Sequence, residues 1–179
     1  EQGASAVLEA ARKIVAIQAL SDPAHTTFNC GIIHGGTSAN VVPDRCEVSV
    51  ALRFHTNRDR DEALSALQSI CGRVATPGTQ CTLSPLAGFP AIEETDRTAA
   101  LFALYRETST ALGLGTPESV YSAGCSDSAY TTALGIPTLC AVGVLGEGQH
   151  SPHEHVLEES LLTQAKRLTA AILSMPDDF

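Results

Sequence analysis

The chain contains no tryptophan, and aromatic residues make up only 4% of its 179 residues. Its core must therefore be built mainly from leucine, valine, isoleucine and alanine, and a hydrophobic content of 44% supplies enough of them. A chain of this length has room for one ordinary domain or for two small ones.

Positive charge is also scarce, since 11 lysines and arginines stand against 20 acidic residues and no basic run occurs. The net charge of -9 disfavours nucleic acid and anionic membranes as partners, but it does not exclude a metal cation. No apolar run approaches the roughly 20 residues of a membrane span. No signal peptide is recognisable where the sequence opens at Glu1.

None of the six cysteines forms a C-x-x-C pair, which argues against a structural zinc knuckle. In a chain of this length they are expected to be reduced, mostly buried thiols rather than disulfides, and this favours a cytoplasmic location. The six are Cys30, Cys46, Cys71, Cys81, Cys125 and Cys140.

Helical spacing of apolar residues occurs in four long stretches. A shorter helix is expected to begin at Ser126–Asp127 and to end at Gly135, and Asp96 is expected to cap the third long helix. The four stretches cover residues 7–15, 64–74, 101–112 and 161–172. The first is expected to turn toward the core a stripe of Val7, Leu8, Ala11, Ile14 and Val15.

Strand alternation is clearest from Cys46 to Phe54, where apolar residues occupy every second position. Phe28, Cys30 and Ile32 alternate in the same way, and the turn-rich connection His34–Asp44 predicts an antiparallel pair. Three further strands are expected, over Gln80–Leu86, Val120–Ser122 and Thr138–Val144.

These elements predict two domains of mixed α/β class, with a boundary near Gly88. Residues 1–88 are expected to form a small antiparallel sheet with two helices on one face. This is a ferredoxin-like α+β unit that lacks its opening strand. Residues 89–179 alternate helices and strands, as an α/β domain does.

His150 stands in a glycine-rich turn after a predicted buried strand, where α/β proteins often place functional groups. A neutral imidazole at this place is a good zinc ligand. The alternative is an ordinary histidine of a surface loop, since the sequence has no H-E-x-x-H motif.

The stretch SAGCSDSAY, from Ser122 to Tyr130, leads from a predicted strand through small residues into a helix. Its backbone N–H groups could bind a carboxylate or phosphate, although it is neither a P-loop nor a nucleophile elbow. Cys125 could be a nucleophile near a helix start, but a small buried thiol is the simpler interpretation. Asp127 by default complements the helix dipole.

Arg53 lies on the polar face of the second strand of the predicted pair, and Asn40 lies in the loop before that strand. The guanidinium of Arg53 has the fork geometry that binds a carboxylate through two hydrogen bonds, and Asn40 could assist. The alternative is an arginine that is simply solvated on the polar face of its strand.

Taken in order, GGTSANVVPDRCEVSVALRF, AGCSDSAYTTALGIPTLCAVG and GEGQHSPHEHV resemble the zinc-dependent carboxypeptidase and aminoacylase family. That family includes glutamate carboxypeptidase, succinyl-diaminopimelate desuccinylase and hippurate hydrolase, and the resemblance covers essentially the whole chain. It implies a dimerising lid domain over residues 1–88, followed by the C-terminal part of a catalytic domain that carries two zinc ions.

The resemblance also implies roles for single residues. His150 falls on the last zinc ligand of the family, in its H-S-x-x-E motif. Asn40 and Arg53 fall on lid residues that hold the substrate's free carboxylate. Gly124, Cys125, Ser126 and Asp127 fall on the loop beside it, where Cys125 replaces a glycine of the family pattern.

The family's other zinc ligands and its general base have no counterpart in this sequence, so no catalytic residue is assigned. We therefore expect a zinc-dependent hydrolase of an amide bond next to a free carboxylate, dimeric through its lid, of which this chain supplies an inactive part. The rival hypothesis is a non-catalytic dimerisation or amino-acid-binding module, and a cysteine hydrolase that uses Cys125 is a third.

Overall fold

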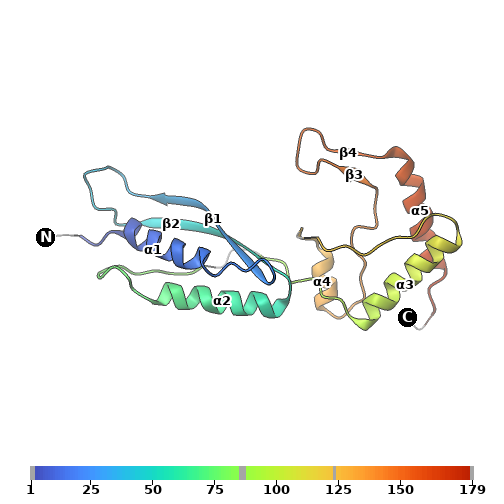
Figure 1. Cartoon of the computed structure of the whole chain (residues 1–179), viewed down its shortest axis with the longest axis horizontal. Helices are drawn as coiled ribbons and strands as arrows, with labels where there is room; N and C mark the ends of the chain where they lie inside the picture. The colour runs from blue at the N-terminus through green and yellow to red at the C-terminus, as the bar shows by residue number, and fades with distance from the viewer. Residues whose placement is uncertain (1–2, 85–87, 123, 178–179) are drawn as a thin grey trace. The chain divides into compact units, whose positions relative to one another are not determined.

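The computed structural model of the chain describes residues 3–84, 88–122 and 124–177. They form two compact units, Glu1–Ala91 and Ile92–Phe179, which we call the N-terminal and C-terminal units. In chain order the elements are α1 (Ala6–Gln18), β1 (Thr26–Gly35), β2 (Cys46–Phe54), α2 (Asn57–Gly72), α3 (Asp96–Ala111), α4 (Ser128–Ala133), β3 (Gly146–Glu147), β4 (His155–Val156) and α5 (Glu158–Leu173) (Figure 1). The unit boundary lies three residues after the domain boundary that the sequence indicated.

The N-terminal unit is built on the antiparallel pair β1 and β2, which the sequence predicted. Its register runs from Thr26 opposite Phe54 to Gly35 opposite Cys46, with an irregularity between Cys30 and Ile32. Along β2 the residues alternate between half-buried and exposed, as the period-two pattern requires.

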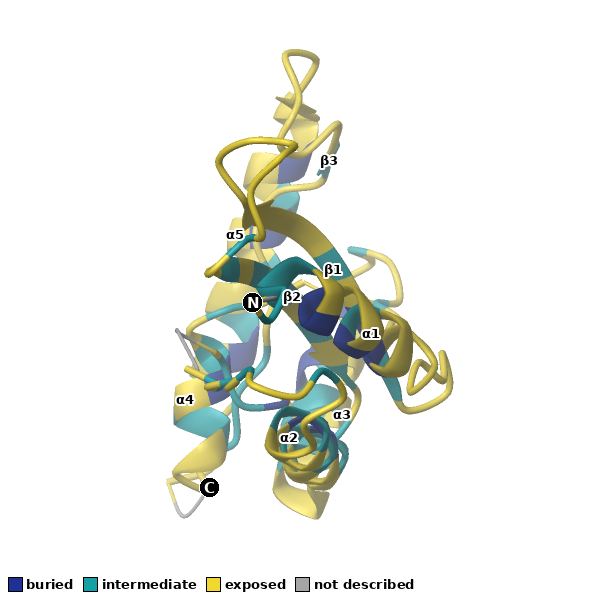
Figure 2. Cartoon of the chain, turned by 90° about the vertical axis from the view of Figure 1, so that its left-hand side faces the viewer, coloured by how far each residue is buried: buried dark blue, intermediate teal, exposed yellow. Residues whose placement is uncertain are grey.

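Helices α1 and α2 both contact the two strands and each other, and they cover one face of the hairpin. The buried centre consists of Ile17, Phe28, Ala63 and Leu67, contributed by α1, β1 and α2. Figure 2 shows buried stretches on α1, whereas the second half of β1 and the loop after it, residues 31–40, are exposed. The predicted two-helix layer on a small sheet is therefore present.

The buried face of α1 is not the apolar stripe that the sequence suggested. Glu9, Ala10, Lys13 and Ile17 are buried, whereas Leu8 and Val15 of the expected stripe are 45% and 71% exposed. The reason lies outside the helix, because the chain that follows α2 leaves backbone groups that need polar partners.

Glu9 and Lys13 supply those partners. The Lys13 ammonium lies 3.0 Å from the Glu9 carboxylate and donates hydrogen bonds to the carbonyl oxygens of Ile70 and Arg73, both at 2.7 Å. The Ala75 amide donates to the Glu9 carboxylate at 3.1 Å. A buried ion pair with these additional bonds therefore ties α1 to the end of α2.

Threonine side chains cap the starts of α2 and α3, and the cap of α3 differs from the predicted one. The Thr56 hydroxyl accepts from the Asp59 amide, and the Asp59 carboxylate accepts from the Thr56 amide, so α2 begins with a capping box. Helix α3 is capped by Thr95, whose hydroxyl accepts from the Thr98 amide at 3.1 Å, and not by Asp96. Asp96 is the first helical residue, where its charge complements the helix dipole.

The C-terminal unit centres on α3 packed against α5. Tyr105 and Ser109 of α3 and Ala171 of α5 are buried. The Ser109 hydroxyl donates to the Gly115 carbonyl oxygen at 2.7 Å, which fixes the turn after α3. The four long helices and the short helix α4 were all predicted.

Three predicted strands are wrong within the part of the chain that is described. Residues 80–84 form no strand, while Pro85 and Leu86 lie outside the described residues. Val120–Ser122 and Thr138–Val144 are also irregular, and Val120 is 82% exposed. A strand exists only when a neighbour pairs with its backbone, and the described residues place no strand beside these stretches.

No described helix is long and apolar enough to span a bilayer.

Candidate functional site

His150 lies at the tip of the short hairpin β3–β4, in which Gly146 pairs with Val156 and Glu147 with His155. Its backbone has φ +64, a left-handed conformation that few residues other than glycine adopt. The turn that contains His150 is closed by a hydrogen bond from the Ser151 amide to the Gly148 carbonyl oxygen at 3.0 Å. His150 is solvent-exposed on this constrained turn.

The glycines of this hairpin are required by close backbone approach. A Cβ atom on Gly146 would lie 2.2 Å from the His155 carbonyl oxygen, and one on Gly148 would lie 2.8 Å from that of His153. Gly148 also has φ +75. The glycines therefore allow the narrow hairpin whose tip carries His150.

The imidazole of His150 has the chemistry of a metal donor, but the described residues do not complete a metal site. Among them, no group of three histidine, cysteine, aspartate or glutamate side chains lies close enough together to hold an ion. A hydrolytic zinc centre needs about three protein ligands. The described part of the chain therefore holds no complete ligand set of this kind, and no catalytic step follows from it alone.

The loop Gly124–Asp127 leads into α4. The Gly124 amide donates to the Ser122 hydroxyl at 3.2 Å, and Asp127 is the N-cap residue of α4, where its carboxylate makes no cap hydrogen bond. Gly124, Cys125 and Asp127 are exposed, and Ser126 is half-buried. Three members of the predicted carboxylate-binding loop are thus open to solvent.

The thiol of Cys140 lies beside this loop, and no motif in the sequence predicted that. Hydrogen bonds from the Ser126 hydroxyl and then from the Ser128 hydroxyl lower the pKa of the Cys140 thiol. The two hydroxyls lie 3.0 Å apart. Only the fold places Cys140 beside the loop, because no motif spacing links residues 126 and 140.

Arg53 and Asn40 belong to the N-terminal unit but lie at opposite ends of its hairpin. Arg53 is on the exposed face of β2, opposite Thr27 at the start of β1. Asn40 is in the exposed loop beyond Gly35, where it accepts a hydrogen bond from the Ser38 hydroxyl at 2.5 Å. The intervening length of β2 corresponds to roughly 20 Å. Within one chain, these two side chains cannot hold the same carboxylate.

The predicted site residues divide between the two units. Asn40 and Arg53 lie in the N-terminal unit, whereas the loop Gly124–Asp127 and His150 lie in the C-terminal unit. The carboxylate-binding and metal-binding roles remain predictions.

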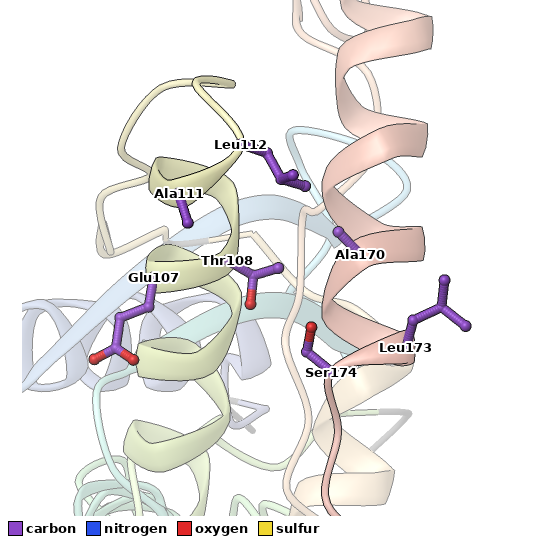
Figure 3. A pocket seen from close by; sticks show the side chains of 7 residues that line it. All are labelled: Glu107, Thr108, Ala111, Leu112, Ala170, Leu173 and Ser174. Atoms are coloured by element: carbon purple, nitrogen blue, oxygen red, sulfur yellow. The ribbon is translucent and has the colours of Figure 1, made fainter.

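A groove between α3 and α5 lies apart from these residues in the sequence and the fold. Figure 3 shows the Thr108 and Ser174 side chains facing the gap between the helices, while the Glu107 carboxylate points away from α5. Its volume is about 490 Å³, and its lining contains none of the predicted site residues. The lining consists of Glu107, Thr108, Ala111, Leu112, Ala170, Leu173 and Ser174.

Comparison with known proteins bears on the whole chain. Residues 1–79 match the family model described as a peptidase dimerisation domain. The chain is 24% identical over 178 residues to carboxypeptidase G2 of Pseudomonas sp. (strain RS-16), which covers 97% of this chain and 42% of that protein.

Solved structures share the fold. A tripeptidase from Staphylococcus aureus superposes with a TM-score of 0.75 at 23% identity, and covers 94% of this chain and 45% of its own. An aminopeptidase from Bacillus cereus gives a TM-score of 0.72 at 23% identity, with the same coverage. A Bacillus subtilis protein described as a dinuclear metal-binding peptidase of the M20 family gives 0.71 at 20% identity, covering 95% and 46%.

The chain spans less than half the length of each of these relatives. Its first 79 residues match a dimerisation domain, and its fold matches peptidase structures over 94% or more of its length. The chain therefore carries the dimerisation domain of the M20 peptidase family, joined to a C-terminal segment with the fold of that family's peptidases.

Proposed function

We propose that this chain is part of a metal-dependent peptidase that cleaves an amide bond next to a free carboxylate, as a glutamate carboxypeptidase does. The observation that carries the proposal is the glycine hairpin β3–β4, which presents His150 to solvent at a left-handed φ. Support comes from the alignment with carboxypeptidase G2, which extends over 97% of the chain.

His150 is proposed to be one ligand of the metal. We take this metal to be zinc, because a neutral imidazole binds that ion well. The described residues do not complete the site, so the remaining ligands and the general base would come from outside this chain. The relative from Bacillus subtilis is described as binding a dinuclear metal centre. On this proposal the 179-residue chain alone is inactive.

Arg53 is proposed to bind the free carboxylate of the substrate. It is exposed on a regular strand, and its guanidinium can donate two parallel hydrogen bonds to a carboxylate. A rigid strand suits this role, because it holds the base of the side chain in a fixed position.

Asn40 requires a different geometry, since it lies at the other end of the hairpin from Arg53. We propose that two copies of the chain associate through the N-terminal unit, and that Asn40 of one copy serves the site to which the other copy contributes Arg53. The exposed apolar residues Leu8 and Val15 lie one above the other on α1 and favour such association.

The test uses the complete gene product that contains this chain and a peptide offered in two forms. We expect hydrolysis of the form with a free C-terminal carboxylate, loss of activity with a chelator, and poor hydrolysis of the C-terminal amide. Arg53→Ala should lower kcat/KM about 10- to 100-fold on the carboxylate and little on the amide.

The matched control is Arg45→Ala. Arg45 is also exposed and lies in the same hairpin, where it forms an ion pair with Glu47, and its loss should leave both substrates unaffected. Equal losses from the two arginine substitutions, or an Arg53→Ala variant with unchanged kinetics, would remove Arg53 from the site.

One observation favours a second candidate function. Because the described residues hold no cluster of three metal-binding side chains, the chain could instead be a non-catalytic dimerisation or amino-acid-binding module. A complete gene product that binds a free amino acid but hydrolyses no amide would support the module and contradict the peptidase.

A further inference from the structure

The two ends of the hairpin β3–β4 are joined through one buried side chain, that of Ser160 in the first turn of α5. Figure 1 shows that β4 leads directly into this helix. The Ser160 hydroxyl accepts a hydrogen bond from the Leu145 amide at 3.0 Å, and it donates one to the Leu157 carbonyl oxygen at 2.6 Å. Leu145 precedes the hairpin and Leu157 follows it, so a single hydroxyl contacts both of its ends.

A backbone hydrogen bond closes the same junction. The Leu157 amide donates to the Leu145 carbonyl oxygen at 2.8 Å. Both polar groups of the Leu145 backbone are therefore held at the start of α5, the carbonyl oxygen by a backbone amide and the amide by the Ser160 hydroxyl. The hydroxyl uses its proton and one lone pair in this junction.

Gln164 makes a similar contact one helical turn further along α5. Its side-chain nitrogen donates to the Gly143 carbonyl oxygen at 2.8 Å. Arg167 fixes the orientation of this side chain, since its guanidinium has no acceptor atom and donates to the Gln164 side-chain oxygen at 3.0 Å. Ser160 and Gln164 are four residues apart and both buried, so one face of α5 holds the chain before the hairpin at two points.

These contacts stand where the sequence predicted the pairing of a strand. Residues 138–144 were expected to form a buried strand, but they are irregular. The Gly143 carbonyl oxygen and the Leu145 amide bind side chains of α5 instead of a neighbouring strand. A strand is held by backbone groups that every residue carries, whereas this stretch is held by two particular side chains. The position of the hairpin therefore depends on single residues of α5.

We propose that Ser160 is a positioning residue, which attaches the hairpin β3–β4 to α5 and so sets where His150 lies. His150 is at the tip of the hairpin, so a small change of angle at the base moves the imidazole further than it moves the base. A displacement of about 1 Å in an active site can lower a rate about 100-fold. The inference rests on the proposed function in one respect, namely that hydrolysis requires the His150 imidazole.

A hydroxyl that only stabilised the C-terminal unit would behave differently from one that positions the hairpin. Its loss would speed amide hydrogen exchange throughout α3 and α5, whereas loss of a positioning hydroxyl should act at the ends of the hairpin. The Leu157 amide distinguishes the two roles. It bonds to Leu145 and not to Ser160, so its exchange rate reports whether Leu145 stays beside the start of α5.

The first experiment measures amide hydrogen exchange by NMR in the 179-residue chain, which requires neither metal nor substrate. Ser160→Ala removes the hydroxyl and introduces a residue that favours a helix. We expect exchange at the Leu157 amide to become roughly 3- to 10-fold faster, while residues 105–109 of α3 keep their wild-type rates. The matched control is Thr163→Val, because the Thr163 hydroxyl donates within α5, to the Glu159 carbonyl oxygen at 3.3 Å. It should leave exchange at Leu157 unchanged.

The second experiment measures hydrolysis of a peptide with a free C-terminal carboxylate by the complete gene product. Ser160→Ala should lower kcat about 10-fold and leave KM within about twofold of the wild type. The reason is that the substrate carboxylate is proposed to bind Arg53, which belongs to the N-terminal unit. Thr163→Val should change neither constant.

Unchanged exchange at Leu157 in Ser160→Ala would overturn the inference, and so would faster exchange combined with an unchanged kcat. Exchange that becomes equally faster in residues 105–109 would overturn it too, because Ser160 would then stabilise the whole unit. A wild-type gene product that hydrolyses no amide would instead contradict the proposed function, while faster exchange at Leu157 would still support attachment of the hairpin through Ser160.

Discussion

At the scale of single residues, the most informative pair is Glu9 and Lys13. Their i, i+4 spacing is visible in the sequence, and such a pair is normally a solvated surface contact worth a few tenths of a kcal/mol. Here it is buried, because its additional partners come from the end of α2, more than 50 residues away. Side-chain spacing within one helix cannot reveal partners contributed by a distant segment.

The environment of Glu9 makes the stability of the N-terminal unit depend on acid. Burial on its own would raise the pKa of the Glu9 carboxyl, but hydrogen bonds from the Ala75 amide, from Lys13 and from Thr76 outweigh it and lower the pKa from 4.5 to about 2. The folded state therefore holds the charged form more strongly than the unfolded state does. The resulting stabilisation is complete above pH 4.5 and is lost as the pH falls toward 2.

Glu9→Gln should lower the free energy of unfolding at pH 7 by about 1–3 kcal/mol, because Lys13 stays buried without its carboxylate. It should also flatten the fall in stability between pH 4.5 and 2, as measured by urea unfolding. Glu62→Gln is the control, since Glu62 forms an exposed i, i+4 pair with Arg58 at 2.8 Å. That change should stay within about 0.5 kcal/mol. Equal effects from both substitutions would show that the buried Glu9–Lys13 pair contributes no more to stability than an exposed ion pair does.

At the scale of elements, helices were easier to predict than strands. Helix α5 carries its own hydrogen bonds, so apolar periodicity over residues 161–172 was enough to locate it. The pair β1–β2 was also predictable, because both strands and their connection lie in one short segment. Val120–Ser122 and Thr138–Val144 look like strands in sequence, but a strand depends on a neighbour that may lie anywhere in the fold.

The hairpin β3–β4 illustrates the same division. Its glycines predicted a turn around His150. The left-handed backbone of His150, and the close approach of the His153 carbonyl oxygen to Gly148, are visible only in three dimensions. The likeness of motifs to a known family, rather than spacing alone, identified His150 as a candidate ligand. Cys140 had no such motif, and only the fold places it beside Ser126.

Gly148→Ala should open this hairpin. An alanine at φ +75, with its Cβ 2.8 Å from the His153 carbonyl oxygen, is strained and cannot keep the present geometry. A cost of about 1–3 kcal/mol should speed amide hydrogen exchange in residues 146–156 by roughly 5- to 150-fold. Gly143→Ala, at a position where a Cβ meets nothing within 4 Å, should leave exchange unchanged. Unchanged exchange in the Gly148→Ala variant would show that the hairpin does not depend on this glycine.

At the scale of the whole molecule, the proposed site requires two copies of the chain to associate through the N-terminal unit. Asn40 and Arg53 lie at opposite ends of one hairpin, so a shared site can include both only if they come from different chains. This arrangement makes a prediction about mixtures of two variants that each have low activity.

Asn40→Ala and Arg53→Ala variants of the complete gene product should each have low activity. When they are mixed and allowed to exchange subunits, half of the dimers become mixed, and each mixed dimer regains one intact site. Activity should recover to about a quarter of the wild-type value. If both side chains acted within one chain, mixing would restore nothing, and each variant re-mixed with itself provides the baseline.

The central claim is that His150 is a metal ligand whose companions lie outside this chain. The most direct test is the metal content of the complete gene product, measured by mass spectrometry of the bound elements in the wild type, in His150→Ala and in His153→Ala. His153 is an exposed histidine of the same hairpin loop and serves as the control. We predict that the wild type and His153→Ala carry the same amount of zinc and that His150→Ala loses a large part of it. Equal metal content in all three proteins, or no metal in any of them, would contradict the account.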